Sequence, residues 1–227
     1  MDFKIIVVED ELSINDILTS AFRAEGYKVR SAFTSREARN LLDSFKPDLM
    51  LLDINLPDES GFELCRFIND KYAIPIIMLT ARNDIVDKIL GLELGADDYI
   101  SKPFHIKEVL TRVKVALRRV EKYKTSAEST FVEINSSVKV NIESRIVVKD
   151  EEEVKLKPTE YDLLEFLFKN RNRVFSREEL LDKVWGLDYD GDLRTVDVHI
   201  RRLRSKLDKE NDKSIIETIF GIGYVMR

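Results

Sequence analysis

The chain contains 227 residues, which is enough for two domains with separate hydrophobic cores. It is 44% apolar and 35% charged, as in a soluble globular protein, and its net charge of −5 argues against a surface that binds nucleic acid throughout. The single Cys65 excludes an internal disulfide and a site with several cysteine ligands, and we interpret it as a small buried helix residue. No apolar run approaches the roughly 18 residues of a membrane span, and the first residues lack the pattern of a secretory signal, so we expect a cytoplasmic protein.

The first half alternates short apolar segments with helix-like segments of about 10 to 15 residues. The expected strands are Lys4–Val8, Lys28–Ala32, Asp48–Leu52, Ile74–Leu79 and Asp98–Ser101. In the first expected helix, the predicted face comprises Leu12, Ile17, Leu18 and Phe22, and Gly26 follows its end. This alternation predicts a parallel sheet with helices on both faces and all five strand ends at one edge.

Chemically matched residues follow several of these strands. The apolar run from Leu49 to Leu52 ends at Asp53 and then breaks into a loop with Pro57 and Gly61. The other strand ends supply Glu9, Asp10, Thr80 and Lys102. Three carboxylates at one edge would repel each other unless a divalent cation lay among them, and Mg²⁺ accepts such ligands while keeping positions for water and phosphate. A lysine and a hydroxyl opposite would hold two phosphoryl oxygens, which predicts a phosphoaspartate at Asp53.

Each of these residues also has an ordinary structural interpretation. Asp53 could cap the next helix, and Thr80 could be an N-cap. The acidic pair Glu9 and Asp10 could begin a helix, and Lys102 could be a solvated loop charge. Five such coincidences at one edge of one sheet favour the shared site.

These motifs resemble the receiver domains of bacterial two-component response regulators. The matching segments lie between about Asp2 and Arg119 and comprise Val7 to Glu11, Asp53 to Pro57 with Gly61, Leu79 to Arg82, and Gly95 to Ile100 leading into Lys102 to Phe104. The resemblance implies that a sensor histidine kinase phosphorylates Asp53, and that Mg²⁺ is held by Glu9, Asp10, Asp53 and the main-chain carbonyl of Asn55. It implies that Thr80 and Lys102 bind the phosphoryl oxygens, and that Tyr99 turns inward when Thr80 moves. A cis Lys102–Pro103 bond is expected in the same turn.

A phosphoryl group beside Lys102 would pull its loop and that of Thr80 inward and so reshape a distant face. We expect this face on the fourth helix, the fifth strand and the fifth helix, where opposite charges surround a small apolar centre. Such a surface suits a two-fold homodimer, because each charge meets its complement on the other copy. Composition alone favours an ordinary solvated face, and the resemblance reverses that preference. The expected contact residues are Lys88, Leu92, Asp97, Asp98, Glu108, Val109, Arg112 and Arg119.

The second half begins after a change in composition. Residues Arg118 to Thr130 are charged and then small and polar, which predicts a short tether. From Phe131 to Lys157, short apolar runs of period two predict a small antiparallel sheet. Pro158 begins an expected helix, and Ser176 with Glu179 forms a capping-box pattern that opens a second helix.

A third helix is expected from Arg194 to Leu207, and it carries a local positive charge in a chain whose two halves are both acidic. Its core stripe comprises Val196, Ile200, Leu203 and Leu207, and the opposite face carries Arg194, Val198, Arg201, Arg202 and Ser205. Arginine can bond guanine bidentately and valine can touch a thymine methyl, so this helix can enter a major groove. The alternative is a solvated amphipathic helix with extended arginines. We assign the base contacts to Arg194, Val198, Arg201 and Arg202, and the backbone contacts to Thr195, His199, Arg204 and Lys206, with His199 alternatively a plain surface histidine.

The last segments, Ile215 to Phe220 and Tyr224 to Met226, flank a glycine-containing turn and predict a hairpin wing. Residues Arg194 to Arg204 and Gly221 to Tyr224 resemble the effector domain of OmpR/PhoB-type transcription factors. The full resemblance implies a flavodoxin-like receiver with a doubly wound five-stranded parallel sheet in residues 1–120, a linker in 121–130, and an α+β winged helix-turn-helix domain in 131–227. It also implies a contact between RNA polymerase and the loop from Trp185 to Leu193. Phe220 stands where many relatives have a basic residue, a departure that bears on arginine readout of the minor groove.

We therefore expect a transcriptional response regulator that dimerises on phosphorylation of Asp53 and binds direct or inverted repeats in double-stranded DNA. It is not expected to be a dedicated enzyme. One alternative is a metal-dependent phosphatase or phosphotransferase with an aspartate nucleophile, but that class needs a second acid where this chain has Asn55. Another is a phosphorylation-independent regulator whose receiver is only a dimer scaffold, which the intact acidic, threonine and lysine positions disfavour.

Overall fold

The computed structural model describes the chain apart from residues 1–2, 81–84, 125–130, 188, 190 and 210–211, and apart from the side chains of 85–89 and 122–124. The described residues form two compact units, Met1–Arg118 and Arg119–Arg227, and each is described by itself. None of the helices in this part of the chain is both long and apolar enough to cross a membrane.

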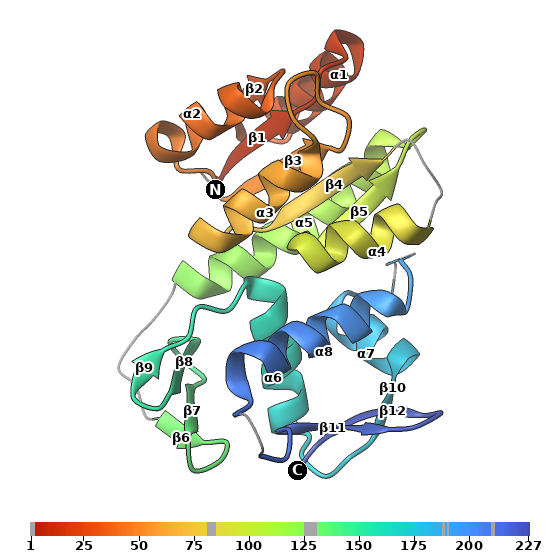
Figure 1. The fold of residues 1–227 in the computed structure, drawn as a ribbon. Coiled ribbons are helices and arrows are strands. Elements are labelled where there is room, and N and C mark those ends of the chain that lie inside the picture. Colours follow the sequence, from red (N-terminus) through yellow and green to blue (C-terminus); the bar gives the residue numbers. More distant parts are fainter. Residues whose placement is uncertain (1–2, 81–84, 125–130, 188, 190, 210–211) are drawn as a thin grey trace. The chain divides into compact units, whose positions relative to one another are not determined.

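The first unit is a doubly wound, flavodoxin-like fold. Its parallel sheet has the order β2-β1-β3-β4-β5, and helices cover both faces (Figure 1). The strands are β1 (Lys4–Val8), β2 (Lys28–Ala32), β3 (Leu49–Asp53), β4 (Ile76–Thr80) and β5 (Asp98–Ser101). The helices are α1 (Leu12–Ala24), α2 (Ser35–Phe45), α3 (Gly61–Lys71), α4 (Ile85–Leu94) and α5 (Ile106–Lys124). The predicted five-stranded parallel sheet is confirmed, with shifted bounds at two strands. β3 begins and ends one residue later than expected. β4 begins two residues later, after Pro75, which has no N–H to give to a ladder, and ends one residue later.

The buried side of α1 differs from the prediction. Leu12 and Ile17 are 63% and 58% exposed, whereas Leu18 and Phe22 are fully buried. The buried stripe is completed by two polar residues, Asn15 and Thr19, which follow the i, i+3, i+4, i+7 spacing of one helix face. The predicted buried face was wrong because it was chosen from apolar residues alone, whereas the face that is buried includes an asparagine.

The expected tether from Arg118 onward is helical in its first part. Helix α5 continues to Lys124, and the division between the two compact units falls inside it. The rest of the expected linker, residues 125–130, lies outside the described residues.

The second unit contains two antiparallel sheets and three packed helices. One sheet has the order β6-β7-β8-β9, with β6 (Phe131–Glu133), β7 (Val138–Asn141), β8 (Ile146–Lys149) and β9 (Glu152–Glu153). The other has the order β10-β12-β11, with β10 (Phe175–Ser176), β11 (Ile216–Ile219) and β12 (Gly223–Met226). The helices are α6 (Pro158–Lys169), α7 (Arg177–Val184) and α8 (Arg194–Leu207), and each pair of them is in contact. The α+β winged helix-turn-helix prediction is confirmed.

Two of the predicted helix starts are seen directly. Pro158 is the first residue of α6, where its missing N–H leaves no bond unmade. At α7 the Ser176 side chain accepts from the Glu179 N–H, and the Glu179 carboxylate accepts from the Ser176 N–H. These reciprocal bonds form the predicted capping box and place α7 directly after β10.

Candidate functional site

Parallel pairing brings the functional side chains of the first unit to one edge of the sheet. Val8 is paired with Leu52, and Asp53 is paired with Leu79. Glu9 and Asp10 therefore follow β1 beside the end of β3, where Asp53 is the last residue of the strand. Thr80 ends β4, and Lys102 follows β5. The sheet thus gathers all five residues that the strand ends predicted.

The acidic side chains form a tight cluster that a lysine closes. Carboxylate oxygens of Glu9, Asp10 and Asp53 lie within 4.8 Å of one another. Lys102 Nζ lies 2.7 Å from Glu9 Oε2 and 2.8 Å from Asp53 Oδ2. Glu9, Asp53 and Thr80 are buried, whereas Asp10 is exposed. The cluster therefore has a buried wall and one side open to solvent.

Burial and charge act together on Glu9. Burial raises the pKa of its carboxyl from 4.5 to about 7, while its hydrogen bond with Lys102 opposes this and the Asp53 charge adds to it. For Lys102, burial lowers the pKa, but hydrogen bonds to Asp53 and Glu9 outweigh burial, so its pKa is raised. Lys102 therefore stays charged at neutral pH. Glu9 gains or loses its proton near neutral pH when Lys102 is the cation beside it.

The donor set fits Mg²⁺. Lys102 supplies one positive charge against three carboxylates, which leaves negative charge for a divalent cation to balance. All three side chains offer the hard oxygen ligands that Mg²⁺ binds, and exposed Asp10 leaves room for water. The Asn55 N–H donates to Asp53 Oδ1 at 3.4 Å, so the backbone of Asn55 lies beside the carboxylate. Glu9, Asp10 and Asp53 are thus the side chains that would hold the ion, and the Asn55 carbonyl as a further ligand stays a prediction.

Further residues support the site, and one of them, Asn15, was not predicted. Buried Asn15 on α1 donates through Nδ2 to the Glu9 carbonyl at 3.0 Å and fixes the acidic loop. A Cβ on Gly61 would lie 2.0 Å from the Asp53 carbonyl oxygen, so only glycine lets α3 begin so close to β3. The Lys102–Pro103 bond is cis, as predicted. Asn15 could have been found as a polar residue at a core position of an amphipathic helix.

The loop after Asp53 is also tied to α2. Asp58 accepts from the Ser35 and Arg36 N–H groups at 2.9 and 3.0 Å, which caps the helix. These bonds hold the pKa of the Asp58 carboxyl below its usual value. Glu59 accepts from Ser35 Oγ and pairs with Arg39 at 2.9 Å, and these bonds lower its pKa. The loop that borders the acidic cluster is thereby held at a second point.

In the second unit, the core stripe of α8 is confirmed, but its outer face is narrower than expected. Val196, Ile200, Leu203 and Leu207 are all buried. On the opposite face Arg194, Arg201 and Ser205 are exposed, and Arg202 is partly exposed. Val198, which was expected to touch a base, is only 6% exposed. The arginines, rather than Val198, are therefore the outward side chains of this helix.

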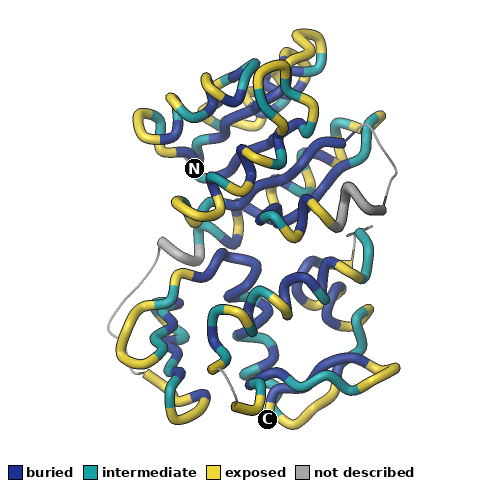
Figure 2. The backbone as a smooth tube through the Cα atoms, in the orientation of Figure 1, coloured by how far each residue is buried: buried dark blue, intermediate teal, exposed yellow. Residues whose placement is uncertain are grey.

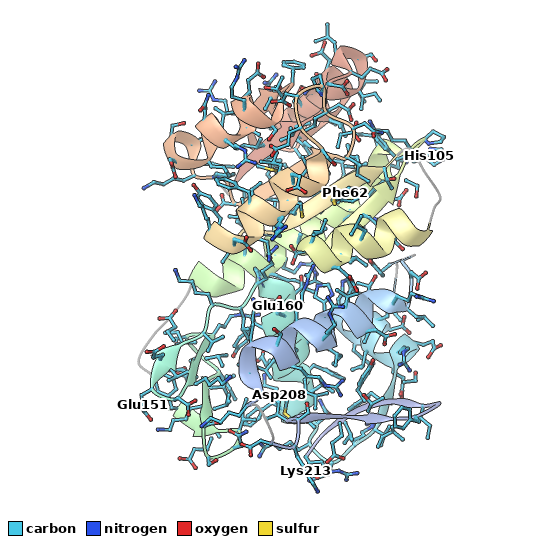
Figure 3. The ribbon with its side chains drawn as sticks, in the orientation of Figure 1. Phe62, His105, Glu151, Glu160, Asp208 and Lys213 are labelled. Atoms are coloured by element: carbon cyan, nitrogen blue, oxygen red, sulfur yellow. The ribbon has the colours of Figure 1, made fainter. Side chains whose placement is uncertain are left out.

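The assignment of His199 and Thr195 to DNA backbone contacts was wrong. Both side chains are fully buried, so neither reaches a phosphate, and His199 is no surface histidine. The His199 ring packs edge-on against Trp185 with their centroids 5.0 Å apart, and its Nδ1 lies 2.8 Å from the Thr195 carbonyl oxygen. The second histidine of the chain, His105, is exposed (Figure 3). His199 thus belongs to the core between α7 and α8.

Two further basic residues of α8 make bonds within the fold. Arg204 donates to the Ile216 carbonyl (Nε, 3.0 Å) and to Thr218 Oγ1 (2.9 Å), both on β11. Lys206 Nζ pairs with Glu160 on α6 at 2.6 Å, close to the end of α8 (Figure 3). Their contact with a DNA backbone stays a prediction, and their first role is to hold α8 in place.

The predicted wing is present as the β11–β12 hairpin. Ile216 pairs with Met226 and Ile219 with Gly223, which leaves a short turn between the strands. Gly221 adopts φ +73° in that turn, a conformation that favours glycine. A three-helix core with a recognition-type helix and this hairpin gives the second unit the parts of a DNA-binding module.

Comparison with known proteins agrees with both units. A model of the response regulator receiver domain matches residues 5–114, and a model of the C-terminal domain of transcriptional regulatory proteins matches residues 151–226. The solved structure of DrrB, a Thermotoga maritima OmpR/PhoB homologue, is 32% identical, with 100% of this chain and 99% of that chain covered and a TM-score of 0.53. This chain belongs to the OmpR/PhoB family.

Two other solved structures are similar to this OmpR/PhoB regulator. A mutant of RitR in which serine replaces a cysteine is 29% identical, with 99% of each chain covered and a TM-score of 0.79. The receiver domain of TorR, the response regulator of a TMAO respiratory system, is 42% identical over 52% of this chain and 98% of its own, with a TM-score of 0.50. The likeness therefore extends over the whole chain as well as over the receiver alone.

The face on which this regulator was expected to dimerise is described only in part. Glu108 is exposed, and the side chain of Lys88 lies outside the described residues, as does Arg82 of the expected motif. Arg112 pairs within the same chain with Asp98 at 3.1 Å and with Glu108 at 3.0 Å. Arg112 is thus paired with two carboxylates of its own chain.

Other residues of that expected interface lie inside the fold. Asp97 is 3% exposed, and its Oδ2 accepts from the Ile76 N–H at 3.0 Å, so it caps the start of β4. Leu92 and Val109 are buried. Assigning Leu92, Asp97 and Val109 to a dimer surface was therefore wrong, because burial removes them from it. Tyr99 is 8% exposed, and its expected inward turn stays a prediction.

Arg119 also has a different position from the one expected. It is 7% exposed, and its guanidinium contacts Thr159 Oγ1, the Val184 carbonyl and Asp162 within the second unit. An arginine that is buried and bonded to α6 and to the end of α7 is not available to a partner chain. The prediction that Arg119 is a dimer contact was therefore wrong.

Proposed function

We propose the molecular steps by which this two-component response regulator, which has a receiver domain and an OmpR/PhoB-type DNA-binding domain, acts as a transcription factor. A receiver domain has a histidine kinase as its partner, and the C-terminal domain binds DNA. The molecular steps that connect the two functions are proposals.

We propose that Asp53 accepts a phosphoryl group from a sensor histidine kinase in the cytoplasm. One carboxylate oxygen of Asp53 attacks phosphorus, the P–N bond to the kinase imidazole breaks, and a P–O bond to Asp53 forms. Mg²⁺, when it is bound by Glu9, Asp10, Asp53 and the Asn55 carbonyl, neutralises phosphoryl charge. The observation that carries this proposal is the bridge of Lys102 Nζ to both Glu9 and Asp53 at 2.7 and 2.8 Å.

Lys102 and Thr80 would then hold the phosphorylated state. Lys102 is charged and already beside Asp53, so it can pair with a phosphoryl oxygen without crossing the site. Thr80 is the last residue of the neighbouring strand, and its hydroxyl can donate to a second phosphoryl oxygen. Movement of the Thr80 loop would be accompanied by a change at Tyr99, in the same way that phosphorylation orders other switch segments.

Phosphorylation is proposed to promote a homodimer through α4, β5 and α5. Arg112 supports this proposal, because its pairs with Asp98 and Glu108 can be exchanged for the same pairs with a second copy. Two winged helices would then bind a direct or inverted repeat with Arg194, Arg201 and Arg202 in the major groove. RNA polymerase is the proposed partner of the loop from Trp185 to Leu193, where Leu187 is 84% exposed.

The test of the phosphorylation site is intact mass after incubation with acetyl phosphate, with and without Mg²⁺. We expect one phosphoryl gain that requires both Mg²⁺ and Asp53, and therefore no gain in Asp53→Asn. The matched control is Asp70→Asn, an exposed aspartate of α3, which should be phosphorylated as the wild type is. No gain in the wild type would support the scaffold interpretation instead, and light scattering on the phosphorylated sample would report whether a dimer forms.

A dedicated enzyme remains the weaker proposal. The position two residues after Asp53 is Asn55, whose amide cannot act as the general acid or base of an aspartate-based phosphatase. Turnover of acetyl phosphate much faster than spontaneous hydrolysis of an aspartyl phosphate would favour the enzyme instead.

A further inference from the structure

The end of the wing presents apolar side chains to solvent. The turn between β11 and β12, residues 220–222 and here called the wing tip, contains no charged residue. Phe220 is 92% exposed and Ile222 is 56% exposed. Figure 2 shows the far end of this hairpin as exposed, whereas most of β12 is buried. An uncharged tip makes no ion pair with phosphates, so its side chains contribute to binding through apolar or stacking contact.

One tie fixes the hairpin to α8 through β11. Arg204 donates to the Ile216 carbonyl and Thr218 Oγ1 on β11, and to Ser214 Oγ just before the strand. A guanidinium that is bonded to both main chain and side chain has little freedom to swing. β11 therefore moves together with α8.

A second tie joins α8 to β12. The Tyr224 hydroxyl donates to Asp197 Oδ1 on α8 at 2.6 Å, and Arg177 Nε lies 2.7 Å from the same oxygen. Burial, together with the hydrogen bond to Asp197, raises the pKa of Tyr224 to about 12, so the hydroxyl keeps its proton and remains a donor at neutral pH. The two strands of the wing are thus tied to α8 at two positions, Asp197 and Arg204.

β12 is also packed closely against β10. Gly223 pairs with Ser176, and a Cβ on Gly223 would lie 1.9 Å from the Phe175 carbonyl oxygen. Since Ser176 is also the N-cap of α7, the base of the wing is fixed to that helix as well. The wing tip consequently stands at a fixed offset from the arginines of α8.

From this rigid arrangement we propose that Phe220, flanked by Ile222, wedges between base pairs in the minor groove beside the major groove that α8 enters. This inference rests on the proposed binding of duplex DNA by α8. Phe220 lies two residues beyond Thr218, which is about 7 Å along a strand. The minor groove, about 6 Å wide, admits a narrow hairpin turn but no helix. Apolar side chains inserted there unstack a base step and kink the duplex.

The chemistry of the tip also predicts which sequences it prefers. Unstacking costs least at flexible pyrimidine–purine steps, so the wing favours such a step at a fixed distance from the arginine contacts. Phe220 adds no charge, so its contribution does not change with salt concentration, unlike that of Arg194, Arg201 and Arg202. The wing would therefore specify deformable DNA rather than a particular hydrogen-bonding pattern.

The test begins with the full-length chain, treated with acetyl phosphate and Mg²⁺, and a random duplex pool from which it selects its own binding sequence. On the selected duplex, Phe220→Ala should bind about 5- to 100-fold more weakly, the loss expected for one stacked aromatic. The dependence of affinity on salt should not change, and the bend measured by circular-permutation gel shift should decrease. Phe220→Trp should restore both affinity and bend. Leu187→Ala, which removes another highly exposed apolar side chain from the same unit, is the matched control and should bind as the wild type does.

The outcomes separate this inference from the proposed function. If the wild type selects a sequence but Phe220→Ala keeps its affinity and bend, the wedge is wrong and DNA binding stands. If the wild type selects no sequence from the pool, both are wrong. A Phe220→Ala variant with lowered affinity but an unchanged bend would place Phe220 against the groove wall and also contradict the wedge. Because Phe220 is 92% exposed, the variant should melt as the wild type does.

Discussion

Lys102 Nζ lies 2.8 Å from Asp53 Oδ2, so the carboxylate that we propose as the phosphoacceptor is paired with a cation before any phosphoryl group arrives. The same ammonium lies 2.7 Å from Glu9 Oε2. One lysine therefore connects the residue that would be modified with a residue that would hold the metal. A change in the charge of either carboxylate consequently shifts the protonation equilibrium of the other.

Replacing Lys102 should slow phosphorylation without unfolding the receiver. Lys102→Gln removes the positive charge that neutralises Asp53 and that would neutralise phosphoryl oxygens as the P–O bond forms. We expect the rate of phosphoryl gain from acetyl phosphate to fall about 10- to 100-fold, measured by intact mass over time. Lys107→Gln makes the same change at an exposed position of α5 and should react at the wild-type rate. Equal rates for both variants would remove Lys102 from the mechanism.

Metal binding should depend on pH through Glu9, whose pKa burial raises from 4.5 to about 7. Between these values the folded metal-free chain holds a proton that the unfolded chain has released. The contribution of Glu9 to the free energy of unfolding should therefore fall as pH rises through this window. Mg²⁺ must displace that proton, so its affinity should be about tenfold weaker at about pH 6 than at about pH 8.

Calorimetric titration with Mg²⁺ at the two pH values tests this expectation, and buffers of different ionisation enthalpy report the released proton. Glu9→Gln carries no titrating group at this position, so it should bind Mg²⁺ more weakly but with little difference between the two pH values. A wild-type affinity that is flat over this range would contradict the raised pKa.

The buried position of His199 predicts a stability effect rather than a DNA-binding effect. His199→Ala removes the ring that packs on Trp185, and it should lower the free energy of unfolding of the second unit by about 2 kcal/mol. Denaturant unfolding followed by fluorescence of Trp185, the single tryptophan of the chain, measures this directly. Arg201→Ala, at an exposed position of the same helix, should leave stability unchanged and weaken DNA binding. The reverse pattern would restore the original assignment of His199 to the DNA backbone.

Two glycines of the wing should respond differently to alanine. Gly223→Ala places a methyl group 1.9 Å from a backbone carbonyl, so β10 and β12 must separate, at a cost of about 2 to 4 kcal/mol in the free energy of unfolding. Gly221→Ala meets no atom within 4 Å and is strained only through its φ of +73°, at a cost of about 1 kcal/mol. Thermal melting of both variants compares the two effects, and equal destabilisation would show that close packing at Gly223 is unimportant.

The sequence alone determined the sheet and which residues gather at the edge where we propose phosphorylation. Short apolar runs that end in turns fix where parallel strands stop, and the ends of parallel strands always meet at one edge. Asp53, Glu9, Asp10, Thr80 and Lys102 could therefore be placed together from local patterns. The capping box at Ser176 and the proline start of α6 were predictable for the same reason, since each is set by residues a few positions apart.

Only the tertiary structure decided which side chains of each helix meet solvent. Periodicity divides α8 into faces, but residues far away in the chain cover it, and they bury His199 against Trp185 and bond Arg204 to β11. In the same way, the sequence presented Asp97 as a surface charge, whereas in the fold it accepts a hydrogen bond from the Ile76 N–H. The sequence pattern assigned no role to Asn15, which in the fold donates to the Glu9 carbonyl. Burial and hydrogen bonding depend on residues that are distant in the sequence and become neighbours only in the folded chain, so the periodicity of a single helix cannot predict them.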